Sequence, residues 1–227
     1  MRILALESAT LAGGVALLDG DVLIGESRSN IALTHSERLM VSVDRLLQDA
    51  GWTVKDLEGL AVSVGPGSFT GLRVGLATVK GLALALSLPV APVPTLDALA
   101  ATLPFADAPV CPLLDARKGE VYTSLYRWDA DGMRRVWEYL ALPPEAAVAR
   151  LCPPVIVLGD GVRPCRPYLD SLGDGVRVAP PAQRLPSPAV VGQLGHALLA
   201  AGRAVSAEAL APLYLRPSEA ELKARRG

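Results

Sequence analysis

The sequence is poor in aromatic residues, cysteines and histidines. Aromatic residues make up 4% of the 227 residues, and two of them are phenylalanines, so we do not expect a sheet that stacks nucleic-acid bases on exposed rings. Cys111, Cys152 and Cys165 are odd in number and form no Cys-x-x-Cys pair, and His35 and His196 lie far apart along the chain. The sequence therefore predicts neither a disulfide framework nor a structural zinc site, and leaves the role of the cysteines open.

Neither sign of charge dominates, and no apolar run is long. Lys plus Arg is 22 and Asp plus Glu is 23, so the formal net charge is −1. A nearly neutral chain lacks the basic field of a protein that grips nucleic acid by itself. The longest apolar stretches, 74–86 and 81–94, are interrupted by Lys80 and Pro89, and a bilayer span needs about 20 apolar residues. With no signal-peptide pattern after Met1, we predict a cytoplasmic protein without a membrane segment.

Apolar runs and turn signals predict a mixed α/β layer in the first hundred residues. Asp19-Gly20 is a hairpin signal, and Thr34 to Glu37 reads as a capping box that begins a helix. Three short strands followed by alternating helices and strands are typical of a meander with right-handed crossovers. The predicted elements are strands 3–6, 14–18 and 22–24, a helix 34–50, a strand 57–64, a helix 72–86, a strand 90–93 and a helix 96–103.

The second half is richer in proline, and a soft boundary is expected near 100–108. Ser187 caps a predicted helix that has Pro188 at its first position and is closed by Gly202. The other predicted elements are strands 110–115 and 120–128 joined as a hairpin, a strand 155–158, and a charged amphipathic helix 218–226.

The glycine-rich segment 65–71 stands between a predicted strand and a helix. Backbone N–H groups and the helix dipole favour an anion there. Leu72-Arg73 stands where a phosphate-binding loop of the Walker type has Gly-Lys, and the spacing does not fit a serine nucleophile elbow. A tight turn that lets the next helix pack closely is the alternative. The candidate anion or nucleotide contacts are Gly65, Gly67, Ser68 and Thr70.

The helix after this segment is small or apolar almost all round. Gly71, Gly75 and Thr78 recur on one face, which permits close contact with a helix of another subunit; an ordinary central helix of one domain is the alternative. The predicted partner interface consists of Leu39, Met40, Val43, Leu46 and Leu47 on the first helix and Gly71, Leu72, Gly75, Leu76, Thr78 and Val79 on the second.

Acidic residues at strand ends are the candidates for chemistry. Glu7, Asp115 and Glu120 could bind magnesium or act as a base if they faced a cleft. Neither histidine has a ligand pattern around it, and His196 is expected to be a partly buried core residue. Catalysis by these carboxylates is the less favoured interpretation.

The segment 65–75, followed by Lys80-Gly81-Leu82-Ala83, resembles the signature of the TsaB (formerly YeaZ) family, and 3–8, 115–122 and 212–216 support it over the whole chain. The resemblance implies an α/β actin-like ATPase (ASKHA) fold of two ribonuclease-H-like lobes of mixed sheet with flanking helices. The lobes it implies are 1–105, with interaction helices 34–50 and 70–86, and 106–210, with a helical segment 211–227 packing back on the first lobe.

The resemblance also implies a function. Family members are non-catalytic partners of a TsaD-like paralogue and a TsaE-like ATPase in forming threonylcarbamoyladenosine next to the tRNA anticodon, and are homodimers when alone. The chain would then have no cofactor or metal, would meet tRNA only through the complex, and would leave ATP to the ATPase.

Two departures bear on this reading. Glu7-Ser8 stands where the family has Asp-Thr, and Thr95 to Leu99 replaces the catalytic paralogue's His-x-x-x-His metal pair. An ATP-binding, kinase-like enzyme and a glycoprotease-like metallopeptidase remain the alternatives.

Overall fold

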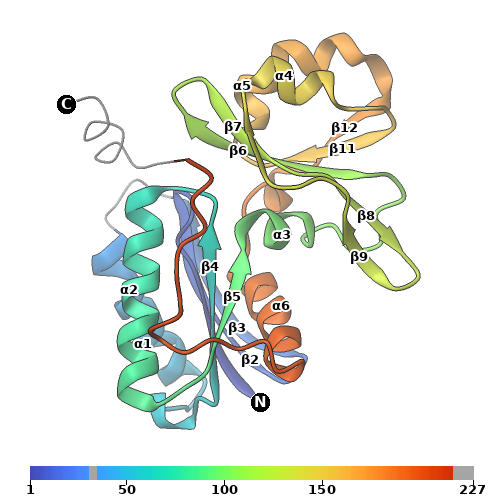
Figure 1. The fold of residues 1–227 in the computed structure, drawn as a ribbon. Coiled ribbons are helices and arrows are strands. Elements are labelled where there is room, and N and C mark those ends of the chain that lie inside the picture. The colour runs from blue at the N-terminus through green and yellow to red at the C-terminus, as the bar shows by residue number, and fades with distance from the viewer. Residues whose placement is uncertain (31–34, 217–227) are drawn as a thin grey trace, which may run out of the picture.

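The computed structural model describes residues 1–30 and 35–216, and for 35–38 the backbone alone. It forms two lobes, each built on a sheet with helices against it (Figure 1). The predicted capping box at Thr34 and the predicted helix 218–226 lie outside the described residues.

The first lobe is built on a five-stranded sheet of order β3-β2-β1-β4-β5. The first three strands are antiparallel, whereas β4 and β5 run parallel to β1, as the predicted meander and crossovers require. Gly20 makes the β2–β3 turn with a left-handed φ of 62°. The strands are β1 (Arg2–Glu7), β2 (Ala12–Asp19), β3 (Val22–Asn30), β4 (Gly59–Gly65) and β5 (Val90–Pro94).

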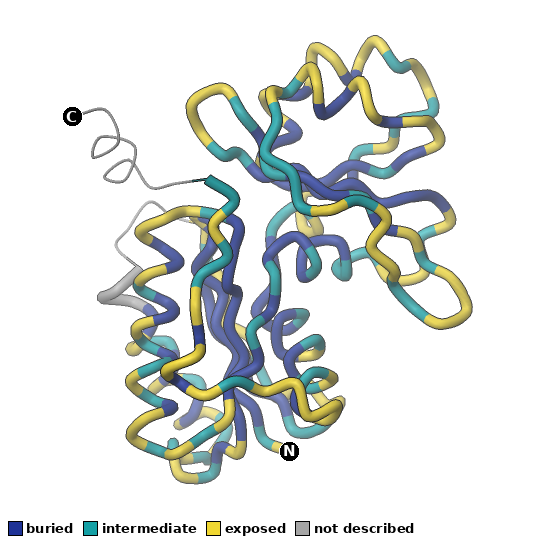
Figure 2. The backbone as a smooth tube through the Cα atoms, in the orientation of Figure 1, coloured by how far each residue is buried: buried dark blue, intermediate teal, exposed yellow. Residues whose placement is uncertain are grey.

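Helices cover both faces of this sheet. The alternation along β1 sends Leu4 and Leu6 into the core beneath α1 and α2, while Ile3 and Ala5 face α6. In Figure 2 the strands other than the edge strand β3 are mostly dark blue between the two helical layers, and the outer sides of the helices are largely exposed. The helices of this lobe are α1 (His35–Asp49), the 3₁₀ turn η1 (Val54–Asp56), α2 (Phe69–Leu86), α3 (Thr95–Ala100) and α6 (Pro188–Ala200).

The chain returns to the first lobe much earlier than predicted. Ser187 caps α6 as expected, but α6 packs on β1 and β2, so the predicted second lobe, 106–210, ends too late. Gly192 and Gly195 allow this contact, because a Cβ on either would overlap Leu18 or Ala61. Only tertiary packing decides which sheet such an apolar helix covers.

The second lobe contains a seven-stranded sheet with the main order β10-β7-β6-β11-β12, to which β8 and β9 are attached through β6. The predicted strand 120–128 is broken in two, because the Ser124 hydroxyl donates to the carbonyl oxygen of Trp137 (2.8 Å) between β7 and β8. The elements are β6 (Val110–Arg117), β7 (Glu120–Thr123), β8 (Tyr126–Asp129), β9 (Gly132–Arg135), β10 (Leu140–Leu142), α4 (Pro144–Ala149), β11 (Val155–Leu158), α5 (Val162–Leu169), η2 (Asp170–Gly175), β12 (Val176–Val178) and η3 (Pro181–Gln183).

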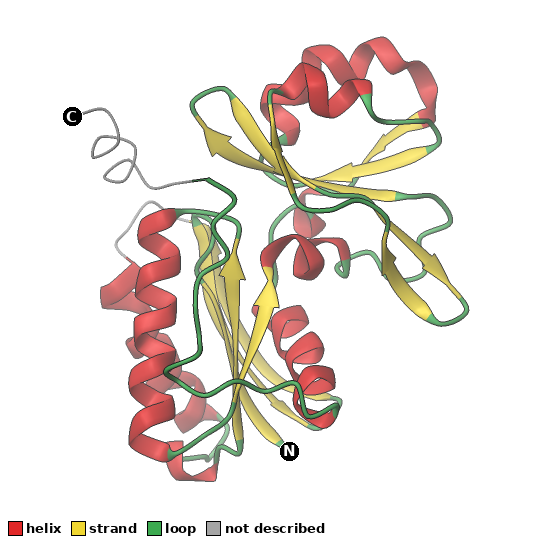
Figure 3. Cartoon of the chain, viewed as in Figure 1, coloured by secondary structure: helices red, strands yellow, loops and turns green. Residues whose placement is uncertain are grey.

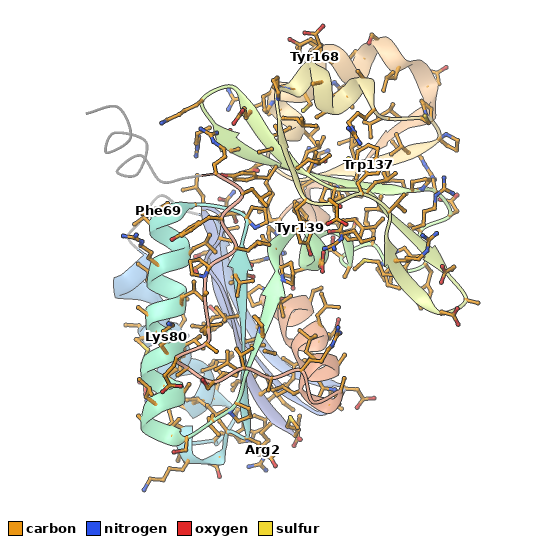
Figure 4. The ribbon with its side chains drawn as sticks, viewed as in Figure 1. Arg2, Phe69, Lys80, Trp137, Tyr139 and Tyr168 are labelled. Atoms are coloured by element: carbon orange, nitrogen blue, oxygen red, sulfur yellow. The ribbon has the colours of Figure 1, made fainter. Side chains whose placement is uncertain are left out.

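A carboxylate on α3 ties the lobes together. Asp97 accepts hydrogen bonds from the hydroxyls of Tyr126 (2.6 Å) and Tyr139 (2.8 Å) of the second lobe. Burial and the nearby Asp97 charge raise the pKa of Tyr126, so it remains a donor. Figure 4 places Tyr139 between the lobes. The two hydrogen bonds to Asp97 therefore help to fix the orientation of one lobe relative to the other.

Two glycines of α2 provide a matched test of this packing. A Cβ at Gly71 would overlap the Ser8 carbonyl oxygen, whereas a Cβ at Gly81 meets nothing within 4 Å. Gly71→Ala should lower the free energy of unfolding by about 1–3 kcal/mol through overpacking. Gly81→Ala should raise it by about 1 kcal/mol, because alanine is the better helix former. Urea unfolding of both variants measures this, and equal effects would contradict the close approach.

Candidate functional site

A cleft of about 580 Å³ lies where the two lobes meet. Its walls come from the loop after β1, the first turn of α2, the β6–β7 hairpin and the segment that follows Leu213, segments that Figure 3 shows at the junction of the lobes. The lining residues are Ala9, Thr10, Leu11, Gly67, Ser68, Phe69, Thr70, Arg73, Leu114, Asp115, Ala116, Arg117, Lys118, Tyr122, Asp160, Tyr214 and Arg216.

The glycine-rich segment 65–71 is compatible with both interpretations of its sequence, a tight turn and an anion contact. Gly67 lies against the carbonyl of Ala9, so the glycines do make a tight turn. The Ser68 hydroxyl caps α2 by accepting from the N–H of Gly71 (3.3 Å). Gly67, Ser68 and Thr70 line the cleft, as an anion contact requires, but Gly65 faces the Leu213 carbonyl and is not part of the lining.

Glu7 is buried beneath the cleft and is not one of its lining residues. One oxygen accepts the N–H of Ala9 (2.6 Å), and the other accepts the hydroxyl of Ser63. Burial raises the pKa of Glu7 from 4.5 to about 7, and the hydrogen bonds oppose the shift only in part. Glu7, the first candidate carboxylate, therefore holds the loop after β1 and is sealed from a ligand.

The remaining carboxylates are held by their neighbours. Asp115 accepts the N–H of Arg117 (2.7 Å) and pairs with its guanidinium (3.3 Å). Glu120 pairs with Arg216 (2.5 Å). Asp160, which the sequence analysis missed, accepts the N–H of Asp115 (2.9 Å), and burial raises its pKa. Across 1–30 and 35–216, no three His, Cys, Asp or Glu residues are placed to hold a metal ion.

Aromatic and basic side chains form one side of the cleft. The rings of Phe69 and Tyr214 stack with centroids 5.2 Å apart, and the Arg73 guanidinium lies 3.9 Å above the centre of the Phe69 ring. Figure 4 shows Phe69 at the start of α2, well above Lys80. In the sequence Phe69, Arg73 and Tyr214 stand out only as parts of motifs, because the stack joins segments distant along the chain.

Most of the predicted interface residues are buried inside the protein itself. The small residues Gly71 and Gly75 face Ser8 rather than a second subunit, so the contact expected between subunits is made within the chain. Leu46 and Thr78 are half-buried, and Met40 is exposed. The members that pack in the protein's own interior are Leu39, Val43, Leu47, Gly71, Leu72, Gly75, Leu76 and Val79.

The outward face of the same helices is partly apolar, beside the exposed polar residues Asp44, Arg45 and Gln48 of α1 and Arg73 of α2. On α2 it carries Leu84, which is 62% exposed, and on α1 it carries Val41, which is 66% exposed. By length and composition alone α2 could cross a membrane, a test that the core helix of a folded domain also passes, and its inner side packs on β4. The exposed apolar or small residues of the two helices are Met40, Val41, Ala77, Gly81, Leu84 and Ala85.

Known proteins resemble this chain over nearly its whole length. The model of the TsaD family, described as tRNA N6-adenosine threonylcarbamoyltransferase, matches residues 29–151. A Bacillus subtilis protein named tRNA threonylcarbamoyladenosine biosynthesis protein TsaB is 33% identical over 98% of this chain and 97% of its own length. The Escherichia coli protein of that name is 34% identical over 95% of each chain.

Solved structures agree with these relatives. YeaZ from Pseudomonas aeruginosa superimposes with a TM-score of 0.80 at 31% identity, covering 94% of this chain and 99% of that one. The activator of 2-hydroxyisocaproyl-CoA dehydratase from Clostridium difficile has a TM-score of 0.51 at 9% identity, covering 94% and 100%. That second likeness concerns the fold alone, and it confirms the predicted actin-like ATPase fold.

The burial of Glu7 predicts a pH dependence of stability. Its pKa in the folded protein, about 7, lies above its usual 4.5, so this group favours folding below pH 4.5 and loses that contribution as the pH rises through 7. Near pH 5 the Glu7→Gln variant should have the same free energy of unfolding as the natural protein. At pH 8 its free energy of unfolding should be about 3 kcal/mol higher. Urea unfolding across this pH range measures the difference, and Glu58→Gln, at an exposed position, is the control. Equal behaviour of the Glu7 and Glu58 variants would contradict the raised pKa of Glu7.

Proposed function

The chain belongs to the TsaB (YeaZ) family of tRNA threonylcarbamoyladenosine biosynthesis proteins, and from this we propose that it is the non-catalytic scaffold that binds and activates a TsaD-like paralogue. Its place in threonylcarbamoyladenosine formation follows from the family. The proposal adds how it acts: through the outward face of α1 and α2, and without a cofactor of its own.

The observation that carries the proposal is the exposed apolar surface of α2. Ala77, Gly81 and Leu84 recur along the outer side of this 18-residue helix, where they lie exposed in the described structure. Exposed apolar surface that continues along an element is typical of a binding site. Small residues let a second helix approach closely, and the neighbouring helix α1 adds the exposed apolar residues Met40 and Val41. A paralogue of the same fold provides a two-helix surface of similar shape, and such a protein is a matching partner.

The condition of the acidic groups supports a non-catalytic role. Glu7 is sealed from the cleft, and Asp115 and Glu120 have cationic partners. In α3, Thr95 and Leu99 stand where the catalytic paralogue has its histidine pair, and both side chains are fully buried. These arrangements support neither the kinase-like nor the metallopeptidase alternative.

Further partners follow from the same proposal. When the paralogue is absent, the apolar surface would join two copies of this chain, because exposure of that surface to water is unfavourable. A TsaE-like ATPase would supply the ATP chemistry of the assembly. The protein would act in the cytoplasm, where the tRNA substrate is.

Substitutions on the outer side of α2 test the docking surface. Leu84→Arg and Ala77→Glu should lower affinity for the paralogue at least tenfold, since each places a charge in an apolar contact. Both positions are exposed, so the melting temperature should stay within about 2 °C of the natural protein's. Val22→Arg, at a 56% exposed position on β3, is the matched control. Gly75→Arg or Val79→Glu would disrupt the core instead. Undiminished co-elution of both docking variants would refute the surface.

Reconstitution tests the scaffold role directly. Purified paralogue and ATPase should modify tRNA with this chain present and lose most of that activity without it. The chain alone should neither transfer threonylcarbamoyl nor hydrolyse ATP, because its carboxylates are sealed or paired. Transfer or ATP turnover by the isolated chain, measured with labelled substrate, would favour an enzyme over a scaffold.

A further inference from the structure

We propose that the rim of the inter-lobe cleft contacts an unpaired, phosphate-bearing stretch of the tRNA substrate directly, once the partner subunit has brought the tRNA to the complex. Arg73, Arg117 and Lys118 would meet the phosphates, and the Phe69–Tyr214 stack would meet a base. This inference rests on the proposed function only for the source of the RNA.

The cleft lining is net basic although the whole chain is not. Its charged members are the cations Arg73, Arg117, Lys118 and Arg216 and the carboxylates Asp115 and Asp160. Arg216 is paired with Glu120, which lies outside the lining, and four cations against these three carboxylates still leave one positive charge in excess among the described residues. The overall charge of −1 therefore hides a local surplus of positive charge, as a phosphate contact requires.

The cations stand at the outside of the cleft. The Arg117 side chain is 69% exposed, whereas that of its partner Asp115 is 30% exposed. Arg117 and Lys118 adopt left-handed φ values of 62° and 53° at the tip of the β6–β7 hairpin. Such positions favour glycine or asparagine, yet here they present two cationic side chains. A phosphate approaching from solvent would meet these cations before the carboxylate.

Arg73 is held ready for an anion on the opposite lobe. No carboxylate of the described chain lies within ion-pair distance of its guanidinium, which is positioned instead by the Phe69 ring. Phe69 and Tyr214 are 36% and 39% exposed, so the stack is only partly covered. Arginine beside exposed aromatic rings is the combination that binds single-stranded RNA, by phosphate contact and base stacking.

RNA fits this surface better than a free nucleoside triphosphate. A triphosphate is bound with Mg²⁺, which takes one or two carboxylate ligands, and in this cleft Asp115 is paired with Arg117 and Asp160 accepts the N–H of Asp115. A phosphodiester needs only the cations that the rim provides. A few phosphate contacts give weak affinity, so the contact would act within the complex, in keeping with the prediction that tRNA is met only there.

The test measures tRNA affinity of the complex of this chain with its paralogue, by fluorescence anisotropy at several salt concentrations. Arg117→Ala with Lys118→Ala, and Arg73→Ala alone, should each weaken binding about three- to tenfold. Each cation removed should reduce the salt slope by about 0.7–0.9. Tyr214→Phe should bind like the natural protein and Tyr214→Ala more weakly. Arg127→Ala and Arg163→Ala, exposed cations outside the cleft, are the matched controls.

Size-exclusion chromatography of the same samples separates the possible failures. If the natural chain does not associate with the paralogue, the proposed function fails rather than this inference. If the rim variants associate normally and bind tRNA with unchanged affinity and salt slope, the inference is overturned. Calorimetry with ATP is the second arm of the test. If the rim variants lose ATP binding while their tRNA binding is intact, the cleft is a free-nucleotide site and the inference is equally overturned.

Discussion

The close approach of α2 to the end of β1 is the constraint on which the rest of the structure depends. Gly71 and Gly75 leave room for Ser8, and the buried Glu7 holds the following loop through Ala9 and Ser63. This contact places the first turn of α2 at the cleft and turns the opposite side of the helix outward. Both candidate binding surfaces are therefore consequences of one packing arrangement.

The two sides of α2 then have different tasks. The inner side, with Leu72, Leu76 and Val79, secures the helix to the sheet and contributes to folding. The outer side, with Ala77 and Leu84, remains apolar without being needed for the core. A helix that is apolar all round but buried on one side leaves apolar surface exposed to water in a monomer, which is unfavourable. In a subunit of a complex, association removes this remaining apolar surface from water.

The cleft shows how an actin-like fold can keep its shape while its acidic groups take structural roles. Glu7 supports a loop, Asp115 and Glu120 form ion pairs, and Asp97 ties the lobes through two tyrosines. The hydrogen bonds of Asp97 to Tyr126 and Tyr139 join the two lobes beside the cleft. Cations and aromatic rings stand at the rim of the cleft, and this is the arrangement on which the proposed RNA contact rests.

Local patterns in the sequence determined the meander, the crossovers and the C-terminal end of α2 at Leu86, since hydrophobic period and turn residues act over a few neighbours. The helix begins at Phe69, three residues before the predicted start. The same local patterns also marked the segment 65–71 and the outward Met40. Tertiary structure alone decided that α6 covers the first sheet, which side of α2 is buried, and that Tyr214 stacks on Phe69. An apolar helix is equally suited to several apolar surfaces, and contacts between distant segments leave no periodic trace, so only the folded chain selects among them.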